Sequence, residues 1–187
     1  AWPQDLTPKV AEALLNLDLK LDGAGSHPKQ NWPVRLTELV QALLRREPKL
    51  AAALLGHPRF ARPEHLDWAT QIGPEYQVPA AQLYLAAVRR DTNFPWSGPL
   101  LELLSLLPEK DVRPLLRGQW KNLLLRDELL LQLAAKPEGA DADRLWQGLT
   151  SSRLDVLRAC VSALQQLPPD AARTNLVTPF ALLRGLL

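Results

Sequence analysis

The apolar part of this sequence is built almost entirely from leucine and alanine. The chain has 42 Leu and 23 Ala but only nine Val and one Ile. Leu and Ala lose little conformational freedom in a helix, whereas β-branched side chains lose rotamers there and are enriched in strands. No stretch alternates apolar and polar residues as a strand rich in Val, Ile and Thr does. The sequence therefore predicts an all-α fold.

The charges of the chain are close to balanced. Twenty-two basic and 20 acidic residues give a net charge of +2. The basic residues are scattered, whereas nucleic-acid-binding proteins usually crowd them on one element. No apolar run approaches the ~18 residues that a membrane span needs. We therefore expect no membrane span and favour a protein partner over a nucleic acid.

Proline and glycine divide the sequence into short helical segments. Proline is favoured at the first helical position and glycine just after the last one. Thr7 is the expected N-cap of the first helix, with Pro8 as its first residue. Together with the apolar spacing, these signals predict helices from Thr7 to at least Leu17 and over about 33–44, 48–56, 63–72, 79–90, 99–107, 110–117, 122–135, 141–148, 153–166 and 178–186.

The longest break in the middle of the chain is DTNFPWSG, from Asp91 to Gly98. We interpret 92–98 as a hinge between an irregular helical half, 1–91, and a more regular half, 99–187. The same pattern also allows the two halves to pack as one continuous domain.

The second half contains an internal repeat, in which an apolar helix ends at a proline and a polar turn leads to a second amphipathic helix. The prolines are Pro108, Pro137 and Pro168, and the glycines that close the following helices are Gly118 and Gly148. Helix pairs that recur every 20 to 50 residues or so are typical of an α-solenoid, whose stacked pairs share one core. We expect a short right-handed solenoid of antiparallel helix pairs. The alternative is an irregular helical bundle, above all in the N-terminal half.

The segment 141–168 combines a first apolar helix, a Ser-rich turn and a second helix that opens with an acidic residue and Val. The residues that carry this pattern are Leu145, Leu149, Ser151, Ser152, Asp155, Val156, Ala159, Ala163 and Leu164. With this pattern the segment resembles one unit of the HEAT-repeat family. The family usually has Arg directly after that Val, where this chain has Leu157. The likeness is fair over 99–187 and weak before residue 91, and it implies stacked helix pairs that bind partners.

Two segments are GHPRFARPEHLDWA, from Gly56 to Ala69, and LTSSRLDVLRACVSALQQLPPD, from Leu149 to Asp170. Together they bear a fainter likeness to helical segments of large secreted proteins of high-GC bacteria. In those proteins HEAT-like stretches accompany haem-binding or other modules, although this chain has no CxxCH motif. Because the chain begins at Ala1 and contains no Met, we expect a processed or excised piece of a longer protein. The likeness favours an extracytoplasmic location.

No catalytic or nucleotide-binding motif is present, since GxSxG, GxxxxGK[ST] and GxGxxG are all absent. We interpret Cys160 as a small buried residue on an apolar helix face. The histidines lack metal-ligand spacing, and we interpret His27, His57 and His65 as surface or turn residues. We predict no enzyme activity, no metal and no cofactor.

Two carboxylate pairs need a separate explanation, because paired carboxylates suffice for glycoside hydrolysis. They are Glu109 with Asp111, and Asp141 with Asp143. Both pairs fall near the start of a predicted helix, where capping and the helix dipole favour anions. We therefore assign them a structural role.

The tryptophans of the second half suggest one binding hypothesis. Trp together with Arg can hold a nucleic acid, a sugar or an acidic peptide in a concave groove. In the alternative interpretation each Trp is a core residue that separates adjacent helices. The candidate groove residues are Trp96, Trp120, Trp146, Arg117, Arg126, Arg153 and Arg158.

The function that these patterns favour is a non-catalytic interaction or scaffolding module that binds protein, in particular other domains of its parent chain. One alternative is a HEAT-like module that binds nucleic acid or excises DNA bases. Another is an accessory domain of a secreted bacterial enzyme or cytochrome-type protein. A free solenoid end needs a polar cap, but ALLRGLL, from Ala181, is mostly apolar. We expect this end to pack on the body or to meet further residues of the parent chain.

Overall fold

The computed structural model of the protein describes residues 6–23, 38–44 and 47–168. Across these ranges every regular element is an α-helix or a 3-10 helix, and none is a strand. The prediction of an all-α chain is therefore confirmed. In the same ranges no helix combines the length and apolar character that crossing a bilayer requires. The helix predicted over 178–186 and the apolar end from Ala181 lie outside the described residues.

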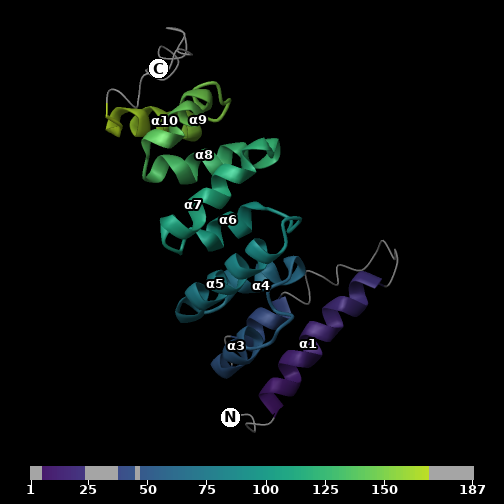
Figure 1. The fold of residues 1–187 in the computed structure, drawn as a ribbon. Helices are drawn as coiled ribbons and strands as arrows, with labels where there is room; N and C mark the ends of the chain where they lie inside the picture. The colour runs from purple at the N-terminus through teal and green to yellow at the C-terminus, as the bar shows by residue number, and fades with distance from the viewer. Residues whose placement is uncertain (1–5, 24–37, 45–46, 169–187) are drawn as a thin grey trace. The chain divides into compact units, whose positions relative to one another are not determined.

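The chain divides into two compact units, Ala1–Pro108 and Glu109–Leu187. The first unit contains a helix over 38–44 and the elements α1 (Leu6–Gly23), α3 (Pro48–Leu55), η1 (Pro63–His65), α4 (Leu66–Gln71), α5 (Pro74–Arg90) and α6 (Gly98–Leu104) (Figure 1). The second contains α7 (Glu109–Gly118), η2 (Gln119–Lys121), η3 (Leu123–Leu125), α8 (Arg126–Ala135), η4 (Gly139–Asp141), α9 (Ala142–Gly148) and α10 (Leu154–Gln166). The interpretation of 92–98 as a hinge stays a prediction.

Prolines begin several of these helices, as predicted. Pro48 opens α3, Pro63 opens η1 and Pro74 opens α5, because the N–H that proline lacks has no helical partner at that position. The start of α5 at Pro74 differs from the predicted start at Pro79, which lies inside the helix. Thr7 is not an N-cap, because α1 already begins one residue earlier.

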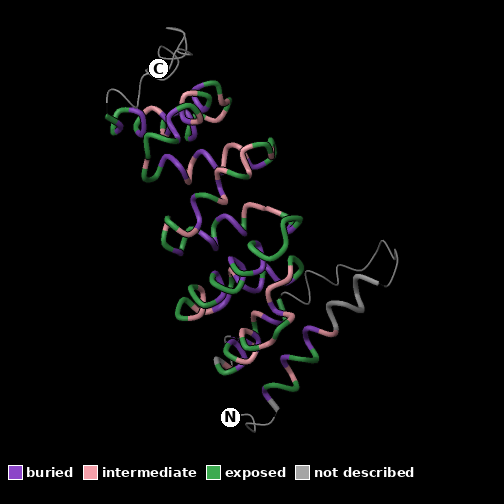
Figure 2. Tube along the Cα trace, viewed as in Figure 1, coloured by how far each residue is buried: buried purple, intermediate pink, exposed green. Residues whose placement is uncertain are grey.

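The core of the first unit lies between neighbouring helices. α3 packs against α1 and α5, and α6 packs against α4 and α5. Buried and exposed residues alternate along each helix, as amphipathic helices require (Figure 2). The largest fully buried side chains of this unit are Leu15, Leu50, Leu54, Phe60, Tyr84, Leu100, Leu103 and Leu104.

The side chain of His65 contacts the loop that follows α3 and stabilises it. Its side chain is buried, and its Nδ1 atom lies 3.1 Å from the carbonyl oxygens of Arg59 and Phe60. Its ring stacks on Trp68 at a centroid distance of 4.8 Å. Of the two alternatives, surface or turn residue, the first is therefore wrong for His65, because aromatic neighbours cover the ring while Nδ1 lies near backbone carbonyls. His65 does lie in a short 3-10 turn, η1. His57 is half-buried in the turn after α3, and His27 lies outside the described residues.

Tyr84 reaches the same loop from α5. Its hydroxyl donates to the carbonyl oxygen of Arg62 at 2.8 Å and lies 3.3 Å from that of Phe60. Burial raises the pKa of the Tyr84 hydroxyl well above its usual range, and Glu64 and Asp67 raise it further. The hydroxyl therefore stays protonated, and remains a donor, well above neutral pH.

Replacing Tyr84 with Phe keeps the buried ring but leaves the carbonyl of Arg62 without its donor. We expect the free energy of unfolding of the first unit to fall by about 1–3 kcal/mol, measured by amide hydrogen exchange along α3 and α5. The control is Tyr76→Phe on the same helix, because the Tyr76 hydroxyl has no hydrogen bond within the described ranges. Equal losses in the two variants would show that the Tyr84 hydrogen bonds contribute nothing.

The core of the second unit is formed mainly by α8, α9 and α10, with α10 packed against both of the others. Cys160 is fully buried there, as predicted. Trp120 and Trp146 are partly buried and pack against this core. The buried residues of the core cluster are Leu130, Ala134, Ala142, Leu145, Leu149, Val156, Cys160, Ala163, Leu164 and Leu167.

Candidate functional site

The structure distributes the predicted groove residues over both units. Trp96 lies in the first unit, half-buried between α5 and α6, and the other six lie in the second unit. Of these six, the structure brings Trp120 and Arg126 together. Arg144, which sequence analysis did not select, joins them from α9. We call Trp120, Arg126 and Arg144 the Trp120 cluster.

Two guanidinium groups approach one indole ring in the Trp120 cluster. The Cζ atom of Arg126 lies 5.2 Å from the Trp120 ring centroid, and that of Arg144 lies 5.7 Å from it. Both distances fall within the range of cation–π attraction. The Nε atoms of both arginines are buried and donate no hydrogen bond within the described part of the chain.

Few anionic groups of the described residues lie near the two arginines of the cluster. Among the described residues no carboxylate lies within ion-pair distance of Arg126. Within the described ranges the single carboxylate near Arg144 is that of Asp141, at a long 3.8 Å, and Arg144 Nη1 donates to the Ala140 carbonyl at 3.2 Å. Two cations that share one ring repel each other. The cluster thus holds positive charge that the described side chains compensate only in part.

The local chain path explains how Trp120 meets Arg126. Trp120 lies in the 3-10 helix η2, and Asn122 separates it from η3. The Asn122 side chain accepts a hydrogen bond from the backbone N–H of Leu124 at 3.2 Å, which fixes the turn into α8. Because η2 packs against α8, the indole lies against the first residue of that helix, Arg126.

The remaining groove residues are engaged differently. Arg117 and Arg153 form ion pairs within the second unit, and the side chain of Arg158 is exposed. Trp146 packs partly buried against the core. Their assignment to one groove with Trp96 stays a prediction.

A buried ion cluster joins α7 to the start of α9. Asp141 is fully buried and accepts hydrogen bonds from Arg113 Nε at 3.1 Å and from Arg117 Nε at 2.7 Å. Arg113 is 5% exposed and also donates to the carbonyls of Leu133 and Lys136, near the end of α8. The cluster therefore connects three helices.

The structural role assigned to Asp141 comes from ion pairs rather than from a helix cap. Asp141 occupies the N-cap position of α9 but makes no side-chain cap hydrogen bond, because its oxygens accept from the two arginines instead. The hydrogen bond with Asp141, above all, raises the pKa of the Arg117 guanidinium above its already high ordinary value. The only sequence signal was the spacing of Arg113 and Arg117, which places both on one face of a helix.

A second polar contact joins the start of α8 to the segment that enters α10. The Nη1 atom of Arg153 lies 2.6 Å from a carboxylate oxygen of Glu128. The hydroxyl of Ser151 donates to Asp127 at 3.0 Å. Asp155 also pairs with Arg153, and this hydrogen bond lowers the pKa of the Asp155 carboxyl.

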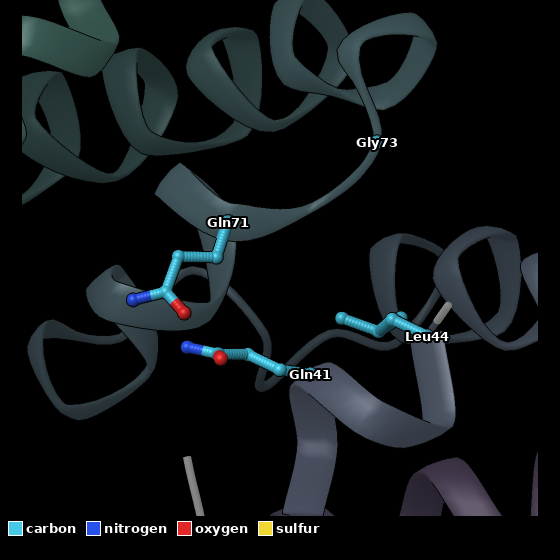
Figure 3. Close-up of a pocket in the computed structure, with 4 residues that line it drawn as sticks. All are labelled: Gln41, Leu44, Gln71 and Gly73. Atoms are coloured by element: carbon cyan, nitrogen blue, oxygen red, sulfur yellow. The ribbon is translucent and has the colours of Figure 1, made fainter. Parts of the chain in front are cut away.

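One pocket of the first unit has a volume of about 350 Å³ and lies between the helix over 38–44 and the end of α4. Its described lining consists of Gln41, Leu44, Gln71 and Gly73. Figure 3 shows the side-chain amides of Gln41 and Gln71 turned toward the same space. No ionisable group belongs to this described part of the lining, which offers hydrogen bonds but no acid, base or nucleophile.

The described residues include no group of three or more His, Cys, Asp or Glu side chains that could hold a metal ion. The thiol of Cys160 is buried in the core of the second unit, and burial raises its pKa to about 12. Because the thiolate is the nucleophile, this thiol is inert in the folded protein.

The buried Cys160 thiol should report the opening of the second unit. At pH 8 we expect Ellman's reagent to label the native chain only through unfolding, and to label it at once in urea. The pKa of the thiol is raised in the folded chain, so its contribution to stability is complete below about pH 9 and is lost toward pH 12. Fast labelling of the native chain at pH 8 would show that Cys160 is exposed.

Comparison with known protein families, with curated proteins and with solved structures finds no match to this chain.

Proposed function

We propose that the protein is a non-catalytic helical-repeat interaction module of the HEAT type. Its second unit then consists of two stacked helix pairs, α7 with α8 and α9 with α10. Gly118 and Gly148 end the first helix of each of these pairs.

The observation that supports this proposal best is the pair of matching polar contacts between successive helix pairs. Arg113 and Arg117 connect the first helix of one pair to the start of the first helix of the next. Glu128 and Arg153 connect the corresponding second helices. Stacked helix pairs of this kind share a continuous core and present an extended surface, which solenoids use to bind partners.

The chemistry of the described side chains agrees with a binding role. The buried thiol of Cys160 is not a nucleophile at neutral pH. One member of each carboxylate pair, Glu109 and Asp141, is held in ion pairs. The pocket beside Gln41 has no ionisable group in its described lining. These features support an interaction module over an enzyme.

The charge distribution supports a protein partner over a nucleic acid. Residues 109–168 contain nine basic and eight acidic side chains, and Arg113, Arg117 and Arg153 are each paired with carboxylates. A nucleic-acid backbone needs a continuous run of free cations. Along 109–168 the basic side chains are instead interspersed with acidic ones.

The proposal is tested by selecting ligands for the immobilised chain from a random peptide library displayed on phage. Selected peptides are then synthesised, and their Kd values are measured by isothermal titration calorimetry. An interaction module should yield peptides with Kd values of roughly 1–100 µM. The control is Val156→Asp, which places a charge in the fully buried core and should abolish binding by unfolding the second unit.

Two results would contradict the proposal. One is that no selected peptide binds the folded chain in solution more tightly than it binds the Val156→Asp variant. The other is that the chain binds oligonucleotides tightly and with a steep salt dependence while it selects no peptide, which would favour the nucleic-acid alternative.

A further inference from the structure

The geometry points to the Trp120 cluster as a binding site for an acidic, partly apolar peptide segment of a partner protein. This inference rests on the proposed interaction function and adds the site and the chemistry of the partner. Its central observation is the approach of Arg126 and Arg144 to the Trp120 ring at 5.2 and 5.7 Å.

The positive charge of the cluster favours the binding of an anion. Arg113, Arg117 and Arg153 of the second unit form ion pairs with carboxylates at 2.5–3.3 Å. Arg126 has no such partner among the described residues. A carboxylate beside the cluster would offset this positive charge and accept hydrogen bonds from guanidinium N–H groups. Arginine suits this role because its planar fork matches a carboxylate.

The cluster also has the composition of an interface centre. Trp and Arg are the residue types most enriched among side chains that contribute strongly to binding. Trp120 is partly buried against the core, so its ring is held in place before a ligand arrives. A preformed aromatic surface costs little conformational entropy on binding.

Exposed leucines lie beside the cluster in the chain. Leu123 and Leu124, in η3 between Trp120 and Arg126, are 69% and 91% exposed. They are not on a loose loop, because Asn122 holds the backbone N–H of Leu124 and because the neighbouring Leu125 is buried. Leu154 is also exposed, and its neighbour Arg153 pairs with Glu128 in the first turn of α8.

We call Leu123, Leu124 and Leu154 the leucine patch. All three belong to the same end of the second unit, where α8 and α10 begin. Grouped exposed leucines are costly in water and are typical of interaction surfaces. A partner that covers them needs apolar side chains next to its carboxylates. The site therefore fits a segment in which Asp or Glu alternates with Leu, Ile or Phe.

The peptides selected for the proposed function also test this site. We expect them to be enriched in acidic and large apolar residues. Replacing their Asp and Glu by Asn and Gln should weaken binding about tenfold or more, and the Arg126→Gln/Arg144→Gln variant should do the same. Leu124→Ser should weaken binding severalfold, through the lost apolar contact alone.

The matched control is Arg90→Gln/Lys110→Gln, which removes the same two positive charges from exposed positions. It should change the Kd less than twofold. Far-ultraviolet circular dichroism and urea unfolding check that each variant is folded. The single variants Arg126→Gln and Trp120→Phe extend the test with milder changes, and each should weaken binding severalfold.

The possible outcomes separate this inference from the proposed function. Peptides that bind the native chain and the Arg126→Gln/Arg144→Gln variant equally would leave an interaction module but overturn the site. Selected peptides without acidic enrichment would do the same. A single-stranded oligonucleotide that binds more tightly than any peptide, and is lost in the same double variant, would replace the acidic segment with a nucleic acid.

Discussion

Replacing Asp141 with Ala should lower the free energy of unfolding of the second unit by about 3–5 kcal/mol, because a buried arginine then loses its main anion. Asp141 is fully buried and Arg113 is only 5% exposed. In the variant, Arg113 keeps only the exposed or half-buried carboxylates of Glu109 and Glu138. Stability is therefore lost because the Arg113 charge stays buried away from water without the anion that compensates it in the native fold.

The Cys160 thiol provides the measurement for Asp141→Ala. Each 1.4 kcal/mol changes the opening equilibrium about tenfold, so thiol labelling should accelerate by about two to three and a half powers of ten. Asp143→Ala is the control, since Asp143 is an exposed residue of the same helix turn that forms no ion pair with the described residues. Its effect should stay within about 0.5 kcal/mol.

A double-mutant cycle separates the ion pair from a general packing defect. Removing Arg113 as well should cost less than the two single losses together, because no buried cation is then left alone. We expect a coupling energy of about 1–3 kcal/mol between Arg113 and Asp141. Additive effects would mean that the two residues stabilise the unit independently, and the proposed connection between the helix pairs would lose its main support.

The helices of this chain were readable from the sequence because their signals are local. Leu and Ala favour the helical state residue by residue, and prolines such as Pro48 and Pro63 begin helices by chemistry confined to one turn. The predicted start of α5 is wrong because its local signal occurs twice. Pro74 and Pro79 could each open a helix, and only packing decides that the helix begins at Pro74.

The ion cluster was not readable, because its members are distant in the sequence. A carboxylate at the first turn of a helix has the same local pattern whether it caps the helix or is buried against another one. Arg117 lies 24 residues before Asp141, and nothing local connects them. His65 was missed similarly, since Phe60 and Trp68 bury it only after the loop has folded.

The Trp120 cluster shows an intermediate case. Trp120 and Arg126 are close in the chain, so their approach could be anticipated from the sequence. Arg144 comes from α9, so its approach to Trp120 depends on how that helix packs. No local pattern in the sequence encodes that packing.

Replacing Gly148 with Ala should destabilise the second unit by about 1–3 kcal/mol, although alanine favours a helix more than glycine does. A methyl group at Gly148 would lie 2.4 Å from the Cys160 sulfur and 3.1 Å from both terminal methyl groups of Leu130. Glycine is thus required where α9 meets α8 and α10, and the reason is close approach rather than an unusual backbone angle.

Gly118 supplies the matched control for this prediction. It ends α7 as Gly148 ends α9, but a methyl group there would meet nothing within 4 Å. Gly118→Ala should therefore be neutral or stabilising by up to about 1 kcal/mol, measured by urea unfolding with hydrogen exchange to localise the change.

Removing the sulfur with Cys160→Ala should restore only part of the stability that Gly148→Ala loses, because Leu130 still obstructs the methyl group. If both glycines tolerate alanine equally, the close packing of α9 on α10 is not a determinant of this fold.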